Sequence, residues 1–411
     1  MTESNSAKQS PPRKGLHVGL VPAPELPERV TGQIVGEMAQ LLEWHVDDSC
    51  SWKVEMLTDP LVGAGSKVSE VLDKAEQLRT RQGWDYVLCI TDLPLFRDGH
   101  VSVAEASDNR GVAVFSQPTL GISPLKKRMR EAILHLVNEM HYGSSRHDRE
   151  RQQQEMDSSH RSEARQRHGI ANDSARSLMG SRFSEMLVPI ERHTSHNPDE
   201  SIDVRFLFRA RWRGYLKLLG GMVRANRPWA MMPAFRHICA VAFGTGAYGL
   251  VFTSLWILSD IYSPLRFLIL MVAAAGSMVA WLIIDHNLWE PQQYTHTRLL
   301  TRLYNAATVL TLTAGVGIYY LTMFVLFLVA VVVFVPPSYM GETLHHPVGW
   351  GSTALLAWLV TSVATFAGAL GAGLESEEAV RNATYGYRQK QRHQKVEKIM
   401  QEEEHSSSSS E

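Results

Sequence analysis

Residues 309–335 have the sequence VLTLTAGVGIYYLTMFVLFLVAVVVFV, which contains no charged side chain over 27 positions. An α-helix needs about 20 apolar residues to cross the ~30 Å hydrocarbon core of a bilayer. No turn signal interrupts the stretch, so one tilted helix fits it better than two spans. Three further apolar segments occur at 235–258, 265–284 and 350–374. The sequence therefore predicts an integral membrane protein with an all-α bundle of four transmembrane helices.

The remainder of the 411-residue chain is more polar and divides into further parts. We expect disorder at 1–14, an α/β soluble domain at 15–144, a charged linker at 145–200, a basic juxtamembrane segment at 201–230, the four-span domain at 231–375 and a charged helical tail at 376–411. The formal net charge of −1 gives no reason to expect nucleic-acid binding. The amino terminus lacks an apolar h-region, so no signal peptide is predicted.

Positive charge is concentrated on one predicted side of the membrane. Seven basic residues without an intervening acid precede the first apolar segment: Arg205, Arg209, Arg211, Arg213, Lys217, Arg224 and Arg227. The loop after the second segment carries Arg298 and Arg302, whereas the loop at 336–349 carries no Lys or Arg. The positive-inside rule places both termini in the cytoplasm of a cell-membrane protein. The helix at 211–223 would lie among anionic inner-leaflet lipids, or would act only as a topology determinant.

The apolar segments themselves contain few functional groups. Apart from Arg236 and His237 at the entrance of the first segment, no ionisable residue lies inside the apolar cores, which argues against a proton pump. Small residues recur at helical spacing at Ala240/Gly244 and at Ala364, Gly368 and Ala372. Such residues allow helices to approach closely, either within one bundle or in a homo-oligomer.

The soluble domain alternates between strand and helix patterns. Strands are expected within 15–24, 52–60, 85–94, 100–107 and 111–121, and helices within 27–46, 68–78 and 125–140. This order predicts a three-layer α/β domain with a mostly parallel sheet. Cys89 lies in one of the apolar strands and Cys239 in the first membrane segment. With Cys50, these cysteines fit small buried hydrophobes better than a disulfide framework or a metal cluster, so no metal site is predicted.

Short polar residues follow the strands of this domain. In α/β sheets, ligands bind beyond the carboxyl ends of the strands. The residues at those ends are Thr58, Asp59, Thr91, Asp92, Ser116 and Gln117. They form either a small-molecule pocket with a carboxylate pair or simple turns that end the strands. Neither a GxGxxG nor a P-loop motif is present, and GAGS at 63–66 is either an anion-binding helix start or a plain one.

One stretch resembles part of a zinc peptidase family. Residues 90–121, ITDLPLFRDGHVSVAEASDNRGVAVFSQPTLG, resemble the strand–loop–strand part of archaemetzincins, which follow it with a zinc helix HExxHxxGxxHC. Here the helix instead contains HLVNEMHYG, with His135, Glu139 and His141. A zinc helix needs two His residues one turn apart with Glu between them, so zinc peptidase chemistry is not expected. His135 and Glu139 are predicted to lie on a solvent-exposed face.

A second resemblance covers most of the chain. TDLPL at 91–95, GMVRANRPW at 221–229 and GAGLESEEAVRNATYGYRQ at 371–389 resemble a group of actinobacterial multi-pass membrane proteins. Some of these carry the name 5,10-methylene-tetrahydrofolate dehydrogenase, which would imply a folate enzyme. The chain contains no recognisable nicotinamide-binding fingerprint, so its cofactor stays unassigned.

These features favour a non-enzymatic function at the membrane. The cytosolic domain would sense a small molecule or hold a partner, and the helical bundle would anchor it in the bilayer or transmit a signal. One alternative is a membrane-anchored enzyme with Asp59 and Asp92 as acid and base. Another is a channel or passive transporter formed by the helices.

Overall fold

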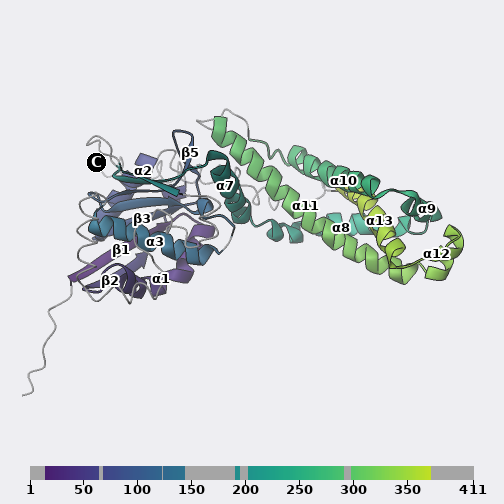
Figure 1. Ribbon diagram of the computed structural model, residues 1–411, viewed down its shortest axis with the longest axis horizontal. Helices are drawn as coiled ribbons and strands as arrows, with labels where there is room; N and C mark the ends of the chain where they lie inside the picture. Colours follow the sequence, from purple (N-terminus) through teal and green to yellow (C-terminus); the bar gives the residue numbers. More distant parts are fainter. Residues whose placement is uncertain are drawn as a thin grey trace, which may run out of the picture. The chain divides into compact units, whose positions relative to one another are not determined.

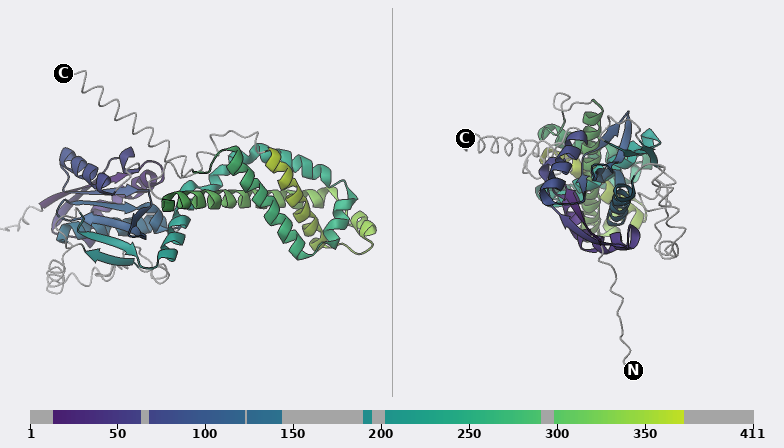
Figure 2. Two further views of the ribbon diagram at one scale, coloured as in Figure 1. Left: turned by 90° about the horizontal axis from the view of Figure 1, so that it is seen from above. Right: turned by 90° about the vertical axis from the view of Figure 1, so that its left-hand side faces the viewer.

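The computed structural model describes residues 14–63, 68–122, 124–143, 190–194, 202–290 and 298–371. These residues form two compact units, which divide between Gly221 and Met222 (Figures 1 and 2). The predicted disordered start, the GAGS stretch after Gly63, most of the charged linker and the charged tail lie outside the described residues.

The first unit is built on an eight-stranded sheet with the order β2-β1-β3-β6-β5-β8-β7, and β4 pairs with β5. The strands are β1 Lys14–Pro22, β2 Cys50–Met56, β3 Tyr86–Thr91, β4 Leu95–Arg97, β5 His100–Ser107, β6 Val112–Ser116, β7 Ile190–Thr194 and β8 Val204–Phe208. Strands β2, β1, β3 and β6 are parallel, whereas β4, β5, β8 and β7 pair antiparallel. The sheet is therefore mixed, and the prediction of a mostly parallel sheet is not confirmed. The connection from β5 to β6 is too short for a parallel crossover.

A tight hairpin joins β4 to β5. Its two turn residues, Asp98 and Gly99, both have positive φ, at 50° and 74°. Asp-Gly is a preferred pair for such two-residue hairpins because both positions need the left-handed region. The sequence pattern did not reveal β4, since only three residues form the strand.

Helices cover both faces of the sheet (Figure 1). Helix α2 (Val68–Gln82) packs on one face against Val87 and Cys89 of β3. Helices α1 (Leu26–His45) and α3 (Leu125–Tyr142) contact each other and the sheet on its other face. Successive strand residues point to opposite faces, and Leu88 and Ile90 are fully buried as well. The continuous apolar run in β3 follows from this double coverage.

The sheet continues beyond the boundary expected at residue 144. Strands β7 and β8 extend it from β5, with Glu105 opposite Arg205 in the register of β5 and β8. The α/β unit therefore includes residues assigned above to the linker and the juxtamembrane segment. Two features hid this extension: β7 has only five residues, and its partner β8 follows a long polar stretch.

The second unit is helical. It contains α8 Arg236–Gly249, α9 Thr253–Ile261, α10 Pro264–Asp285, α11 Arg298–Phe334, α12 Pro337–Leu344 and α13 Trp350–Gly371, after the 3-10 helix η4 Pro228–Phe235. Among the described residues, α10, α11 and α13 are long and apolar enough to cross a membrane. Helices α8 and α9 meet at 91° and give a fourth crossing only if the bent pair is one span. A bundle of four straight spans is not confirmed.

The bend lies where the sequence predicted one uninterrupted span at 235–258. Helix α8 has 14 residues, about 21 Å of helix, which is shorter than a ~30 Å hydrocarbon core. At the break, the indole Nε1–H of buried Trp256 donates to the Leu250 carbonyl at 3.0 Å. This bond satisfies a carbonyl that the interrupted helix leaves without its usual partner. Hydropathy alone could not reveal the break, because both arms are apolar.

Helix α11 is one continuous helix of 37 residues, in agreement with the prediction of a single helix over 309–335. At ~1.5 Å per residue it is about 55 Å long, so it exceeds the ~30 Å core by several turns. Its first turns carry Arg298 and Arg302. Gly246 and Gly368 lie at close contacts inside this unit: an added Cβ would be 2.2 Å from Phe327 and 2.9 Å from the Tyr319 hydroxyl, respectively. Gly244, by contrast, faces open space.

Candidate functional site

The residues predicted at the strand ends do line one edge of the parallel part of the sheet. Thr91 and Ser116 are register partners at the ends of β3 and β6. The Asp59 N–H donates to the Pro22 carbonyl at 3.3 Å, which joins the end of β2 to the end of β1. The predicted rim of polar residues therefore exists, although its members are largely buried.

Most of the polar groups on this rim bind the chain itself. The Thr91 hydroxyl accepts the Leu93 N–H at 3.0 Å, and the Ser116 hydroxyl donates to the Leu93 carbonyl at 2.6 Å. The Thr58 hydroxyl donates to Glu28 at 3.1 Å. The Thr91 bond closes a turn directly after β3, whereas the bonds of Ser116 and Thr58 join residues that are far apart in the sequence.

The remaining rim residues differ in exposure. Asp92 and Gln117 are 3% and 2% exposed, whereas Asp59 is half-buried. Gln117 Oε1 has no hydrogen-bond partner among the described residues. A buried amide oxygen without a partner is costly, so this rim atom has spare capacity for a ligand.

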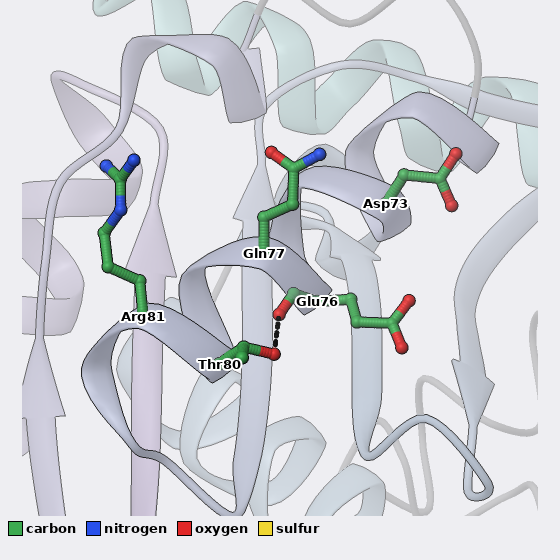
Figure 3. A pocket seen from close by; sticks show the side chains of 5 residues that line it. All are labelled: Asp73, Glu76, Gln77, Thr80 and Arg81. Carbon is green, nitrogen blue, oxygen red and sulfur yellow. Dashed lines mark hydrogen bonds between the residues drawn. The ribbon is translucent and has the colours of Figure 1, made fainter.

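A surface depression lies elsewhere, along α2 (Figure 3). It is lined by Asp73, Glu76, Gln77, Thr80 and Arg81, which all belong to this one helix. The carboxylates of Asp73 and Glu76 each pair with Arg110, at 2.7 and 2.6 Å. A depression on one helix face whose acids already form ion pairs is a weak candidate for a binding site.

The basic residues predicted at the membrane surface occupy different environments. Arg205 belongs to β8, is only 13% exposed and lies 3.6 Å from the buried Glu105 carboxylate. It is therefore part of the sheet rather than of a membrane surface. Arg209 is 72% exposed and pairs with Glu191 at 3.3 Å.

Helix α7 (Arg211–Asn226) carries most of the others. The Arg211 guanidinium donates to the Asp98 carbonyl and to His100 of the β4–β5 hairpin, and the Tyr215 hydroxyl donates to Gly99. Lys217 lies over the Phe208 ring. Arg213 lies over Trp212, whose side chain is 63% exposed. One face of α7 thus packs on the hairpin and strand β8, and the other presents Arg213 and Trp212. Arg224 and Arg227 follow near the end of the helix, and Arg227 has a left-handed backbone conformation.

Helix α3 also differs from the prediction, and His135 is half-buried rather than exposed. Glu139 was expected on a solvent-exposed face, but its side chain is 11% exposed and pairs with Arg192 of β7 at 2.7 Å. The pair links α3 to the outermost strand of the sheet. The sequence could not reveal it, because Arg192 follows a long polar segment.

A second cluster lies at the opposite, amino-terminal end of the parallel strands. Asp47 follows α1, Cys50 begins β2, and His141 lies in the last turn of α3. Their ligand-type atoms lie within 4.8 Å of one another. The Cys50 thiol donates to Asp47 Oδ2 at 3.3 Å, and His141 Nε2 lies 3.3 Å from the same oxygen. We call these three residues the Asp–Cys–His cluster.

Neighbouring groups hold this cluster in place. The Ser49 N–H and hydroxyl both donate to Asp47 Oδ1, at 2.9 and 2.7 Å. His141 Nδ1 lies 3.1 Å from the Tyr86 hydroxyl. The imidazole also makes an edge contact with the Trp52 ring, with centroids 5.4 Å apart. Each member therefore has a fixed orientation.

The cluster shifts the protonation of its members. Burial alone would raise the pKa of Asp47, but hydrogen bonds from Ser49, Cys50 and His141 outweigh it and lower the pKa to about 2. Burial and the Asp47 carboxylate raise the pKa of the Cys50 thiol, and burial lowers the pKa of His141 despite Asp47. The result is a carboxylate facing a neutral thiol and a neutral imidazole.

The sequence analysis did not find this cluster. Asp47 and His141 are 94 positions apart and lie on elements that meet only in the fold. The local signal was the Asp-x-x-Cys spacing between a helix end and a strand start, which is weak alone.

Comparison of the chain with protein-family models, curated proteins and solved structures gives no match.

Proposed function

We propose that the protein is a membrane-anchored sensor or scaffold, with its α/β unit in the cytosol and its helical unit in the cell membrane. The observation that carries the anchoring is the surface of the long apolar helices. On α10 and α11, large apolar side chains such as Ile269, Ile284, Val333 and Phe334 are 58–76% exposed. Such surfaces are stable only in lipid or against another apolar surface.

The orientation follows from the distribution of charge. Arg298 and Arg302 lie before the apolar part of α11, whereas the loop after α12 contains no Lys or Arg. With the bent α8–α9 pair as one crossing, the α/β unit and both termini lie in the cytoplasm. The exposed Arg213 and Trp212 on α7 would then contact anionic inner-leaflet lipids.

The hydrogen bonds favour a scaffold over an enzyme, and a membrane anchor over a channel. An enzyme at the strand-end rim would need free polar groups, yet the hydroxyls of Thr91 and Ser116 serve the turn at Leu93. A polar channel would need groups that face a path. In α11 and α13, Thr311 and Thr361 instead donate to carbonyls four residues earlier in the same helix, at 2.7 Å each.

Labelling of single cysteines with a membrane-impermeant maleimide tests the topology. In a background without native cysteines, Thr80→Cys in the α/β unit and Asn287→Cys after α10 should react only from the cytoplasmic side. Glu342→Cys in α12 should react only from outside. Reaction of Thr80→Cys and Asn287→Cys from opposite sides would show that α8–α9 does not cross, and would contradict the proposed arrangement.

A thermal-shift screen of the full chain against metabolites tests the sensor function. A ligand at 100 times its Kd should add about 2.7 kcal/mol of stability. Asp59→Ala and Asp92→Ala should abolish the shift if the ligand binds at the strand-end rim. A protein that folds well but responds to no metabolite would favour a scaffold, and turnover of a hit would favour the enzyme.

A further inference from the structure

Three side-chain types that bind zinc in proteins meet in the Asp–Cys–His cluster. We propose that Asp47, Cys50 and His141 bind one divalent transition-metal ion of the zinc class. This proposal stands on the geometry of the cluster and does not depend on the proposed membrane function. It differs from a peptidase zinc helix, because α3 contributes only His141.

The distances suit one tetrahedral ion. Zinc bonds of about 2.3 Å to sulfur and 2.0–2.2 Å to nitrogen or oxygen place neighbouring ligand atoms roughly 3.3–3.6 Å apart. Here Asp47 Oδ2 is 3.3 Å from Cys50 Sγ and 3.3 Å from His141 Nε2. All three atoms lie within 4.8 Å of one another, so small side-chain rotations suffice to surround an ion.

The surrounding hydrogen bonds are those of a metal site. Ser49 occupies Oδ1 of Asp47 and leaves Oδ2 for an ion. The Tyr86 hydroxyl lies 3.1 Å from His141 Nδ1, the ring nitrogen that does not face the cluster. Bound imidazoles regularly donate this second N–H to an oxygen acceptor, which fixes the tautomer that ligates.

The charge of the three ligands and their exposure to solvent also suit a divalent metal ion. A carboxylate and a thiolate neutralise a divalent ion, and the imidazole binds without charge. Binding would displace one proton, from the Cys50 thiol, because the neutral His141 ring keeps its single proton on Nδ1 while Nε2 ligates. The side chains of Asp47 and His141 are 13% and 16% exposed, so an ion can reach the cluster and keep water as its fourth ligand. The thiolate and imidazole donors favour zinc-class metals over magnesium or calcium.

Cobalt(II) titration of the full-length, chelator-treated protein in detergent tests the site. Binding should saturate at one ion per chain, with thiolate-to-cobalt charge-transfer absorption in the near ultraviolet that Zn²⁺ displaces. Cys50→Ser should remove this band, and His141→Gln should lower the affinity at least tenfold. Tyr86→Phe keeps all three ligands but loses the supporting bond, so its affinity should fall about 10-fold.

Two control variants separate the cluster from other donors. Cys239→Ser removes a thiol of the helical unit, and His135→Gln removes another histidine of α3; both should keep the band at full strength. Absence of a stoichiometric thiolate band in the wild-type protein would overturn the proposal, whatever the folding of the variants. A band retained in Cys50→Ser or lost in Cys239→Ser would also overturn it.

Discussion

At the scale of single residues, Arg205 and Arg209 lie close together in the sequence, but we expect them to contribute differently to stability. The Arg205 guanidinium lies beside the buried Glu105 carboxyl. Burial raises the pKa of Glu105 even though the guanidinium is nearby. Removal of one partner of a buried pair costs about 3–5 kcal/mol, so Arg205→Ala should destabilise the α/β unit by roughly 3 kcal/mol. Arg209→Ala breaks only an exposed pair and should cost less than about 1 kcal/mol.

Denaturant unfolding of both variants measures this difference, and binding to anionic vesicles provides the second measurement. Arg205→Ala should leave vesicle binding unchanged if the protein stays folded. If both variants lost vesicle binding equally and did not differ in stability, Arg205 would be shown to contact the membrane surface.

The sequence predicted which residues lie at strand ends better than it predicted which residues contact each other. It placed Thr91, Asp92 and Ser116 at strand ends, because local pattern determines where a strand stops. It did not foresee Glu139 with Arg192, or His141 with Cys50, because those contacts depend on how distant elements pack.

At the scale of elements, two glycines in helices should respond oppositely to alanine. An added Cβ at Gly221 in α7 would lie 1.9 Å from the Pro118 carbonyl oxygen, so the helix must shift. Gly221→Ala should lower the free energy of unfolding by about 1–3 kcal/mol. An added Cβ at Gly36 in α1 would meet nothing within 4 Å. Gly36→Ala should therefore raise the free energy of unfolding by about 0.5–1 kcal/mol. Thermal unfolding of the two variants checks both signs; stabilisation by Gly221→Ala would contradict the close contact.

A pH-dependent contact joins α9 to the loop before α13. The hydrogen bond to Asp260, at 3.0 Å, raises the pKa of His346 above its ordinary 6.5. A raised pKa in the folded state means that this contact stabilises fully below pH 6.5 and is lost as the pH rises through the folded value. Asp260→Asn should therefore lower the melting temperature more at about pH 5.5 than at about pH 8.5. An equal effect at both values would show that protonated His346 contributes nothing.

Elements were predictable where one local signal dominates. The strands β1, β2, β3 and β6 and the single long α11 follow from hydrophobic periodicity or length. The bend between α8 and α9 did not, since it arises from specific contacts such as the indole of Trp256 on Leu250 within a uniformly apolar run.

At the scale of the whole molecule, the decisive question is where the α/β unit ends. The sequence placed its end at residue 144, yet β5 pairs with β8 from Ser102 to Ala106, and β7 follows β8. A fragment 14–144 would leave β5 as an edge strand with unpaired backbone groups and would expose Glu105. Edge strands of this kind promote association between chains.

We therefore expect fragment 14–144 to aggregate, and fragment 14–221 to be monomeric and to unfold cooperatively. Light scattering coupled to size-exclusion chromatography measures the first property, and circular dichroism during heating measures the second. A matched fragment 14–221 with Phe206→Asp, which places a charge at a buried position of β8, should behave like the shorter fragment. A monomeric fragment 14–144 that melts at the same temperature as 14–221 would show that the sheet needs neither β7 nor β8. The prediction depends on pairing across about one hundred positions, which is why local sequence patterns could not supply it.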